Sequence, residues 1–170
     1  MNPHALFVIT TSISVGTITV LMSNHWMLAW IGLEINTLAI IPLMTKTPHP
    51  RAIEASTKYF LIQATASAMV LFSSTLNAWF TGEWAINNLT HPLANATMTI
   101  ALAMKLGLAP LHLWLPEVIQ GLALTTGLIL STWQKLAPMA LLLQLSNTIN
   151  LTLLMTTGIL STILGGWGGI

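Results

Sequence analysis

The chain has 170 residues, of which 54% are hydrophobic and only 5% are charged, and its net charge is +1. Soluble domains carry about 25% charged residues, so this composition excludes a soluble globular domain and predicts a polytopic membrane protein. A nucleic-acid partner is also excluded, because the only basic cluster is Lys46, Arg51 and Lys58. The absence of cysteine excludes disulfides and thiolate-held metal or iron–sulfur sites.

On the scale of about 20 apolar residues per membrane crossing, the sequence divides into about six helical spans within a single transmembrane domain, residues 1–170. Prolines and charges mark residues 45–51 as a loop. The predicted fold class is an all-α transmembrane helix bundle in which one helix, around Pro110, is discontinuous. The predicted spans are 5–22, 26–44, 52–80, 95–118 (broken), 122–145 and 148–164.

The basic residues predict the orientation of the chain. Lys46, Arg51 and Lys58 all lie at the second loop, so the positive-inside rule places that loop, and the N-terminus two spans earlier, on the negative side of the membrane. Glu54 and Lys58 are spaced i,i+4 at the start of the third span, which is typical of a structural ion pair on a helix surface.

Three further charges, Glu34, Lys105 and Lys135, lie inside apolar stretches of near-membrane length. A charge at the bilayer centre costs roughly 2.5–3.5 kcal/mol on insertion scales. A chain with so few charges has little reason to bury three of them unless they act. The leading hypothesis is therefore ion or proton movement.

The fourth span combines a buried lysine with proline breaks. Pro110 lacks an N–H, so it is expected to free the carbonyl of Leu106 beside Lys105, and Pro116 is expected to free the carbonyl of His112. A freed carbonyl at membrane depth needs another partner, which predicts a polar, hydrated pocket. A lone histidine such as His112 is usually a packing residue. Because His112 lies beside the break and the lysines, a role in a proton relay is as good an interpretation as packing.

The fifth span repeats this arrangement, because Pro138 is expected to free the carbonyl of Gln134 next to Lys135. Structural alternatives stay open for each charge. Lys105 and Lys135 could snorkel towards an interface, and Glu34 could form an inert bridge with a buried lysine. No phosphate loop, metal-spaced histidine pair or nucleophile–base pattern is present, so no cofactor-binding or metal site is predicted in this chain.

Three segments, residues 30–34 (WIGLE), 54–60 (EASTKYF) and above all 105–117 (KLGLAPLHLWLPE), resemble the antiporter-like membrane subunits of respiratory complex I. The resemblance covers the whole chain, including the closing GGWGG at 165–169. It implies inverted five-helix repeats, each with one broken helix, so this chain would hold one repeat and the first helix of the next.

The resemblance also implies a relay in which Glu34 pairs with Lys105 of the broken helix, Lys135 continues the path and His112 lies just past the break. NADH, FMN, iron–sulfur clusters and ubiquinone would be handled by other chains of a proton-translocating NADH:ubiquinone reductase. The implied partners are other membrane-arm subunits and the lipid bilayer, not a free-standing monomer. The location would be the mitochondrial inner membrane, with the N-terminus and residues 45–51 on the matrix side.

Members of this family continue for about another repeat. The sequence is therefore expected to be C-terminally truncated, and this chain alone is not expected to translocate protons. Two alternatives to the leading hypothesis remain. A stand-alone cation/proton antiporter subunit would not copurify with an NADH-oxidising assembly. In a purely structural membrane-arm module, a Lys105→Met, Glu34→Gln double variant would assemble and pump normally.

Overall fold

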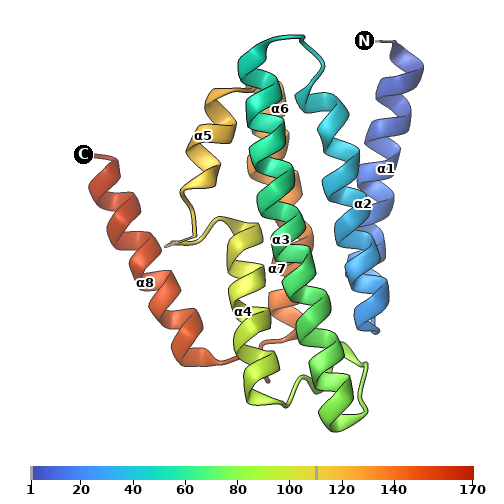
Figure 1. Ribbon diagram of the computed structural model, residues 1–170, viewed down its shortest axis with the longest axis vertical. Helices are drawn as coiled ribbons and strands as arrows, with labels where there is room; N and C mark the ends of the chain where they lie inside the picture. Colours follow the sequence, from blue (N-terminus) through green and yellow to red (C-terminus); the bar gives the residue numbers. More distant parts are fainter. Residues whose placement is uncertain (1, 110) are drawn as a thin grey trace.

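The computed structural model describes residues 2–109 and 111–170, and this part of the chain is a helix bundle without strands (Figure 1). The all-α expectation is confirmed. The helices are α1 (Pro3–Met22), α2 (Trp26–Met44), α3 (Pro50–Thr81), α4 (Pro92–Leu106), α5 (Trp114–Gln120), α6 (Leu124–Thr132), α7 (Leu136–Gln144) and α8 (Leu151–Gly168), with short 3₁₀ turns η1 (Ile86–Asn88) and η2 (Trp133–Lys135).

The first three helices alternate in direction, so the α2–α3 loop lies at the same end of the bundle as the start of α1 (Figure 1). Within the described residues, four helices, α1, α2, α3 and α8, are long and apolar enough to cross a membrane. The fourth and fifth predicted spans are instead divided into shorter helices: α4 and α5 take the fourth, and α6, η2 and α7 the fifth.

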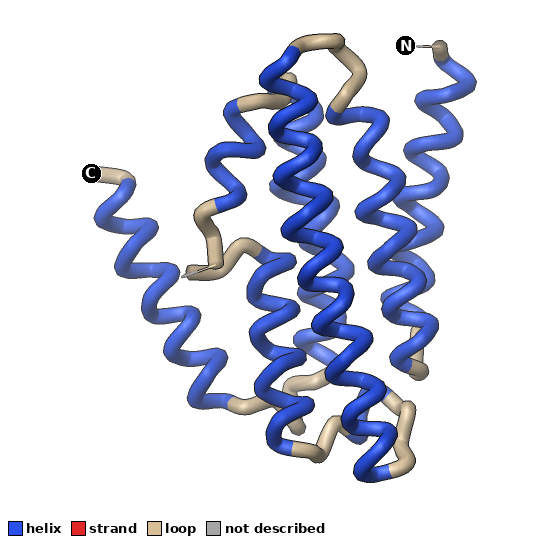
Figure 2. Tube along the Cα trace, in the orientation of Figure 1, coloured by secondary structure: helices blue, strands red, loops and turns tan. Residues whose placement is uncertain are grey.

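The break between α4 and α5 begins at a glycine. Gly107 has φ 75°, in the left-handed region, and its N–H bonds to the carbonyls of Ala103 and Met104, which caps α4. Figure 2 shows the non-helical segment between the two helices at about mid-height of the bundle. The predicted role of Pro110 falls on a residue outside the described ones. A second, shorter interruption that the sequence did not predict occurs at η2, in the middle of the fifth span.

Three helices begin with a side-chain cap followed by proline. Asn2, His49 and His91 each accept a hydrogen bond from a backbone N–H in the first turn of α1, α3 and α4, at 3.0, 3.1 and 3.4 Å. Proline at the next position has no N–H to leave unpaired and has a helical φ. His25 caps α2 without a proline. These histidines therefore have structural roles at helix ends.

A close helix crossing brings Gly16 of α1 against Gly32 of α2. A Cβ added at Gly16 would lie 2.5 Å from the Asn36 Oδ1 and 3.0 Å from the Gly32 carbonyl oxygen. Small residues at such crossings let two backbones approach closely, as in many membrane helix pairs. This crossing holds Asn36 at its position on the inner face of α2.

Gly16→Ala should therefore lower the free energy of unfolding by about 1–3 kcal/mol, the usual cost of overpacking. Gly158→Ala is the matched control, because no atom lies within 4 Å of a Cβ at that position. Thermal unfolding of the detergent-purified protein measures both. Equal midpoints for Gly16→Ala and Gly158→Ala would contradict the tight crossing.

The apolar core consists of two clusters stacked along the bundle. One contains Val20, Trp26, Val70, Met98 and Leu141, among others. The other lies towards the α2–α3 loop and includes Ile13, Ile40, Tyr59, Val118 and Leu130. The polar cavity described next draws lining residues from both clusters, so it lies at the boundary between two apolar layers.

Candidate functional site

Lys105, in the last turn of α4, is the buried charge at the centre of the site. Its side chain is held inside the bundle, because the residue is only 4% exposed. The Nζ donates to Ser67 Oγ at 2.8 Å and to Gln63 Oε1 at 3.4 Å. Both acceptors lie on α3, one helical turn apart, and both are buried. Lys105 therefore does not snorkel.

Lys105 also lies at the C-terminal end of α4, where the helix dipole is negative. The C-terminal end of a helix carries partial negative charge that favours a cation, and α4 ends one residue after Lys105. In membrane transporters, half-helix ends at mid-membrane depth are used in this way to hold ions. The break thus stabilises a positive charge inside the bundle.

A polar cavity connects Lys105 to Lys135. Its polar lining comes from α2, α3, α4 and the α6–α7 segment: Asn36, Thr37, Tyr59, Gln63, Lys105, Gln134 and Lys135. The cavity leaves about 20 Å³ of space in which the centre of a water molecule can lie. That volume is enough for one or two waters at most. The two lysines therefore share one water-sized space.

Lys135 reaches this cavity because of the interruption at η2. The 3₁₀ turn Trp133–Lys135 separates α6 from α7 and presents Gln134 and Lys135 to the cavity. Gln134 Nε2 is buried and has no hydrogen-bond partner among the described residues. Such an atom normally bonds to a water or an unseen group. The unpaired amide thus marks the place next to Lys135 where a bridging water would fit.

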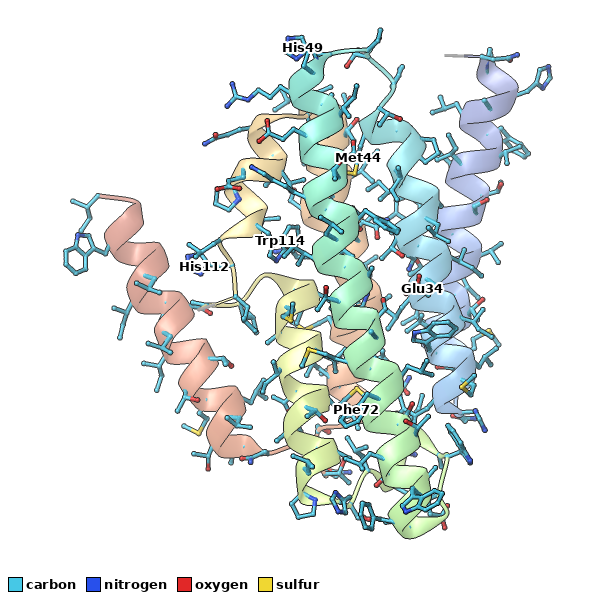
Figure 3. The ribbon with its side chains drawn as sticks, viewed as in Figure 1. Glu34, Met44, His49, Phe72, His112 and Trp114 are labelled. Carbon is cyan, nitrogen blue, oxygen red and sulfur yellow. The ribbon has the colours of Figure 1, made fainter. Side chains whose placement is uncertain are left out.

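Glu34 lies at mid-height on α2 (Figure 3) and is half-buried. Its backbone carbonyl accepts a hydrogen bond from Thr37 Oγ1 at 2.9 Å. The predicted Glu34–Lys105 pair is not a direct contact, since the ion pairs found among the described residues are both made by Lys58. The side chains of Glu34 and Lys105 are therefore not within ion-pair distance.

His112 lies on a different side of the broken helix. It points towards α8 (Figure 3) and lines a separate cavity of about 360 Å³ with Ser161 and Gly165 of that helix. Its Nδ1 is buried without a hydrogen-bond partner in the described part of the chain. The structure therefore brings Lys105 and Lys135 together and places His112 elsewhere.

The carbonyl that Pro116 was expected to free has a new partner within the break. The carbonyl of His112, expected to be freed by Pro116, accepts a hydrogen bond from Leu115 N at 3.1 Å. The i to i+3 bond of this turn replaces the helical bond that proline cannot donate.

The broken helix is fastened across its gap and to α3. Trp114 Nε1 of α5 donates to the Met104 carbonyl of α4 at 3.1 Å. The predicted surface pair is confirmed, since Lys58 Nζ lies 2.9 Å from Glu54, and it also lies 3.0 Å from Glu117 of α5. These contacts fix α5, and with it the Trp114 side chain that closes one side of the cavity.

Sequence reasoning missed the uncharged polar residues that surround the lysines, chiefly Gln63, Ser67, Asn36 and Gln134. A signal for two of them exists, because Gln63 and Ser67 are spaced i,i+4 and so lie on one face of a helix. Thr17 extends the polar group towards α1, since its hydroxyl lies 3.5 Å from Asn36 Oδ1 and accepts from Trp133 Nε1 at 3.1 Å.

Comparison with protein families gives a clear result. The family model described as NADH:quinone oxidoreductase/Mrp antiporter, transmembrane, matches residues 23–170. The chain belongs to this family. Among curated proteins, it is similar to NADH-ubiquinone oxidoreductase chain 2 of Aquarana catesbeiana (68% identity), Xenopus laevis (66%) and Oncorhynchus mykiss (65%), each over all 170 residues. It spans about half the length of these relatives, 49% in each.

Solved structures of this antiporter-like family share the fold. A chain in respiratory complex I from Thermus thermophilus with bound aureothin matches 96% of this chain and 39% of its own length, with a TM-score of 0.89 and 27% identity. A chain in the Mrp complex from Dietzia matches 83% of this chain and 29% of its own length, with a TM-score of 0.77 and 19% identity. The helix arrangement thus occurs in a respiratory and in an Mrp complex.

Proposed function

We propose that this antiporter-like chain moves protons through its buried polar cavity as part of a proton-translocating NADH:ubiquinone oxidoreductase. The observation that carries the proposal is the shared cavity, in which two lysines from different helices line a space the size of one or two waters. Lysine and water can both donate and accept protons, so a proton can pass between the two amines without crossing apolar side chains.

Each charged residue has a stated role in this proposal. Lys105 holds the proton at the centre, where Ser67 and Gln63 orient its amine. Glu34, half-buried on α2, is the carboxylate of the relay that exchanges protons with Lys105. Lys135 receives the proton through the cavity, and His112 is the candidate for onward transfer on the α8 side.

The proposal assigns no redox step to this chain. NADH oxidation, FMN, iron–sulfur clusters and quinone reduction belong to other subunits, and the partners are those of the membrane arm. The location is the mitochondrial inner membrane, with the start of α1 and the α2–α3 loop facing the matrix. The curated relatives' name and the basic residues at that loop support this assignment.

A Lys135→Met variant of the intact membrane assembly tests the proposal. Proton transfer through this chain should slow by about a hundredfold or more, the usual cost of removing a group that donates and accepts the proton. Proton uptake into vesicles, followed with a pH-sensitive dye during NADH oxidation, measures it. Lys46→Met is the control, because Lys46 lies in the α2–α3 loop, outside the cavity lining. Normal proton uptake in Lys135→Met would refute the role.

A cation/proton antiporter is the second candidate, because the family model covers Mrp antiporters as well. The two candidates differ in what drives the protons. An antiporter would move protons when a sodium gradient is imposed without NADH, whereas the proposed function requires NADH oxidation. Proton movement in vesicles under each driving force separates them.

A further inference from the structure

We propose that the face where α3 begins and α5 ends is a binding site for a phospholipid with an ethanolamine headgroup. Two adjoining hollows form the site. The polar hollow, of about 240 Å³, is lined by Arg51, Glu54, Lys58, Glu117 and Gln120. The apolar hollow, of about 300 Å³, is lined by Leu61, Ile62, Leu113 and Trp114, and shares Lys58 and Glu117 with the first.

The depth of the two hollows fits the layers of a bilayer. Helix α3 has 32 residues, so it is about 48 Å long and exceeds the hydrocarbon thickness of about 30 Å. The charged residues of α3, Arg51, Glu54 and Lys58, all lie in its first three turns, so this end of the helix is placed at the level of the lipid headgroups. Leu61 and Ile62 lie one to two turns deeper, where acyl chains begin.

The charges of the polar hollow are separated, not fully paired. Lys58 is shared between the carboxylates of Glu54 and Glu117, at 2.9 and 3.0 Å, and both carboxylates are more than half exposed. That group has one cation for two anions. Arg51 instead donates to the uncharged Gln120 Oε1, at 3.3 Å. One side of the hollow is therefore negative and the other positive.

This pattern complements a zwitterion. Arg51 can bond a phosphate with two parallel N–H groups. The surplus carboxylate charge suits a primary ammonium, which donates up to three hydrogen bonds. A choline group has no N–H to donate, and an anionic headgroup would leave the carboxylate side unpaired. Leu61 and Leu113 are 58% and 71% exposed, so an acyl chain can cover them below the headgroup.

Photo-crosslinking in the intact membrane assembly tests the site. The assembly is placed in phosphatidylcholine bilayers that carry a small fraction of a probe lipid with a diazirine on its acyl chain. The headgroup of the probe is ethanolamine, choline or glycerol in parallel samples. Mass spectrometry then measures labelling of the peptides containing residues 58–62 and 113–117.

The ethanolamine probe should label both peptides about tenfold more than the choline probe, which corresponds to the tenfold change expected for one added charge-assisted contact. Arg51→Gln should reduce this labelling to the choline level. Lys46→Gln, which removes a cation at the same end of the bundle but outside both hollows, should leave it unchanged.

Equal labelling by the ethanolamine and choline probes, or stronger labelling by the glycerol probe, would overturn the proposal. This comparison uses the unaltered protein, so it stands even where Arg51→Gln disturbs assembly. The site is independent of the proton relay, and proton uptake in Arg51→Gln should equal that of the unaltered assembly at the same protein level.

Discussion

Lys105→Met is expected to stop proton transfer through this chain while the chain still folds. Methionine fills a similar volume and removes the desolvation cost of a buried charge, which offsets the two hydrogen bonds to Ser67 and Gln63 that it also removes. The substitution removes the amine that donates to Ser67 and Gln63 of α3 and lines the cavity. The rate of proton uptake should fall by a factor of about 100 or more.

The measurement is NADH-driven proton uptake in vesicles that contain the intact assembly. NADH oxidation in uncoupled vesicles serves as the internal reference, because it reports the redox reaction without the proton gradient. Lys46→Met is again the matched lysine replacement. Proton uptake at the level of the unaltered assembly would show that Lys105 is an inert buried residue.

The double variant Gln63→Leu, Ser67→Ala is expected to lower the free energy of unfolding. It removes both hydrogen-bond acceptors of the Lys105 amine. The double variant should lose about 3 kcal/mol or more of unfolding free energy, because each hydrogen bond to a charged group contributes about 1.5–3 kcal/mol. Thermal or denaturant unfolding in detergent measures the loss.

A control and a rescue make this prediction specific to Lys105. Ser74→Ala removes another buried hydroxyl of α3 that bonds only within its own helix, to the Leu71 carbonyl, and it should change stability by about 1 kcal/mol or less. Adding Lys105→Met to the double variant should restore most of the lost stability. A double variant that Lys105→Met does not rescue would locate the loss elsewhere in α3.

Much of the fold could be predicted because its signals are local. Apolar runs of membrane length predicted the helices, and the proline and charge pattern predicted the loop between α2 and α3. The interruption at η2 could not be predicted with the same certainty, because Pro138 lies within α7 and the 3₁₀ turn precedes it. Such a turn depends on how the segment packs against its neighbours.

The site could be predicted only in part. Lys105 and Lys135 are conspicuous in apolar sequence, but their common cavity depends on contacts between segments far apart in the chain. Gln63 and Ser67 are two of many polar residues in α3, and the sequence does not say which of them face Lys105. His112 lies within the break between α4 and α5, yet it points towards α8 and away from the cavity of the two lysines.

A double-mutant comparison tests the central claim, that Lys105 and Lys135 belong to one proton path. NADH-driven proton uptake is measured for Lys105→Met, Lys135→Met and the variant carrying both changes. Groups that act in one path are strongly non-additive, so the combined variant should lose no more proton uptake than the more impaired single variant. Losses that multiply in the combined variant would contradict a shared path and assign the two lysines to separate ones.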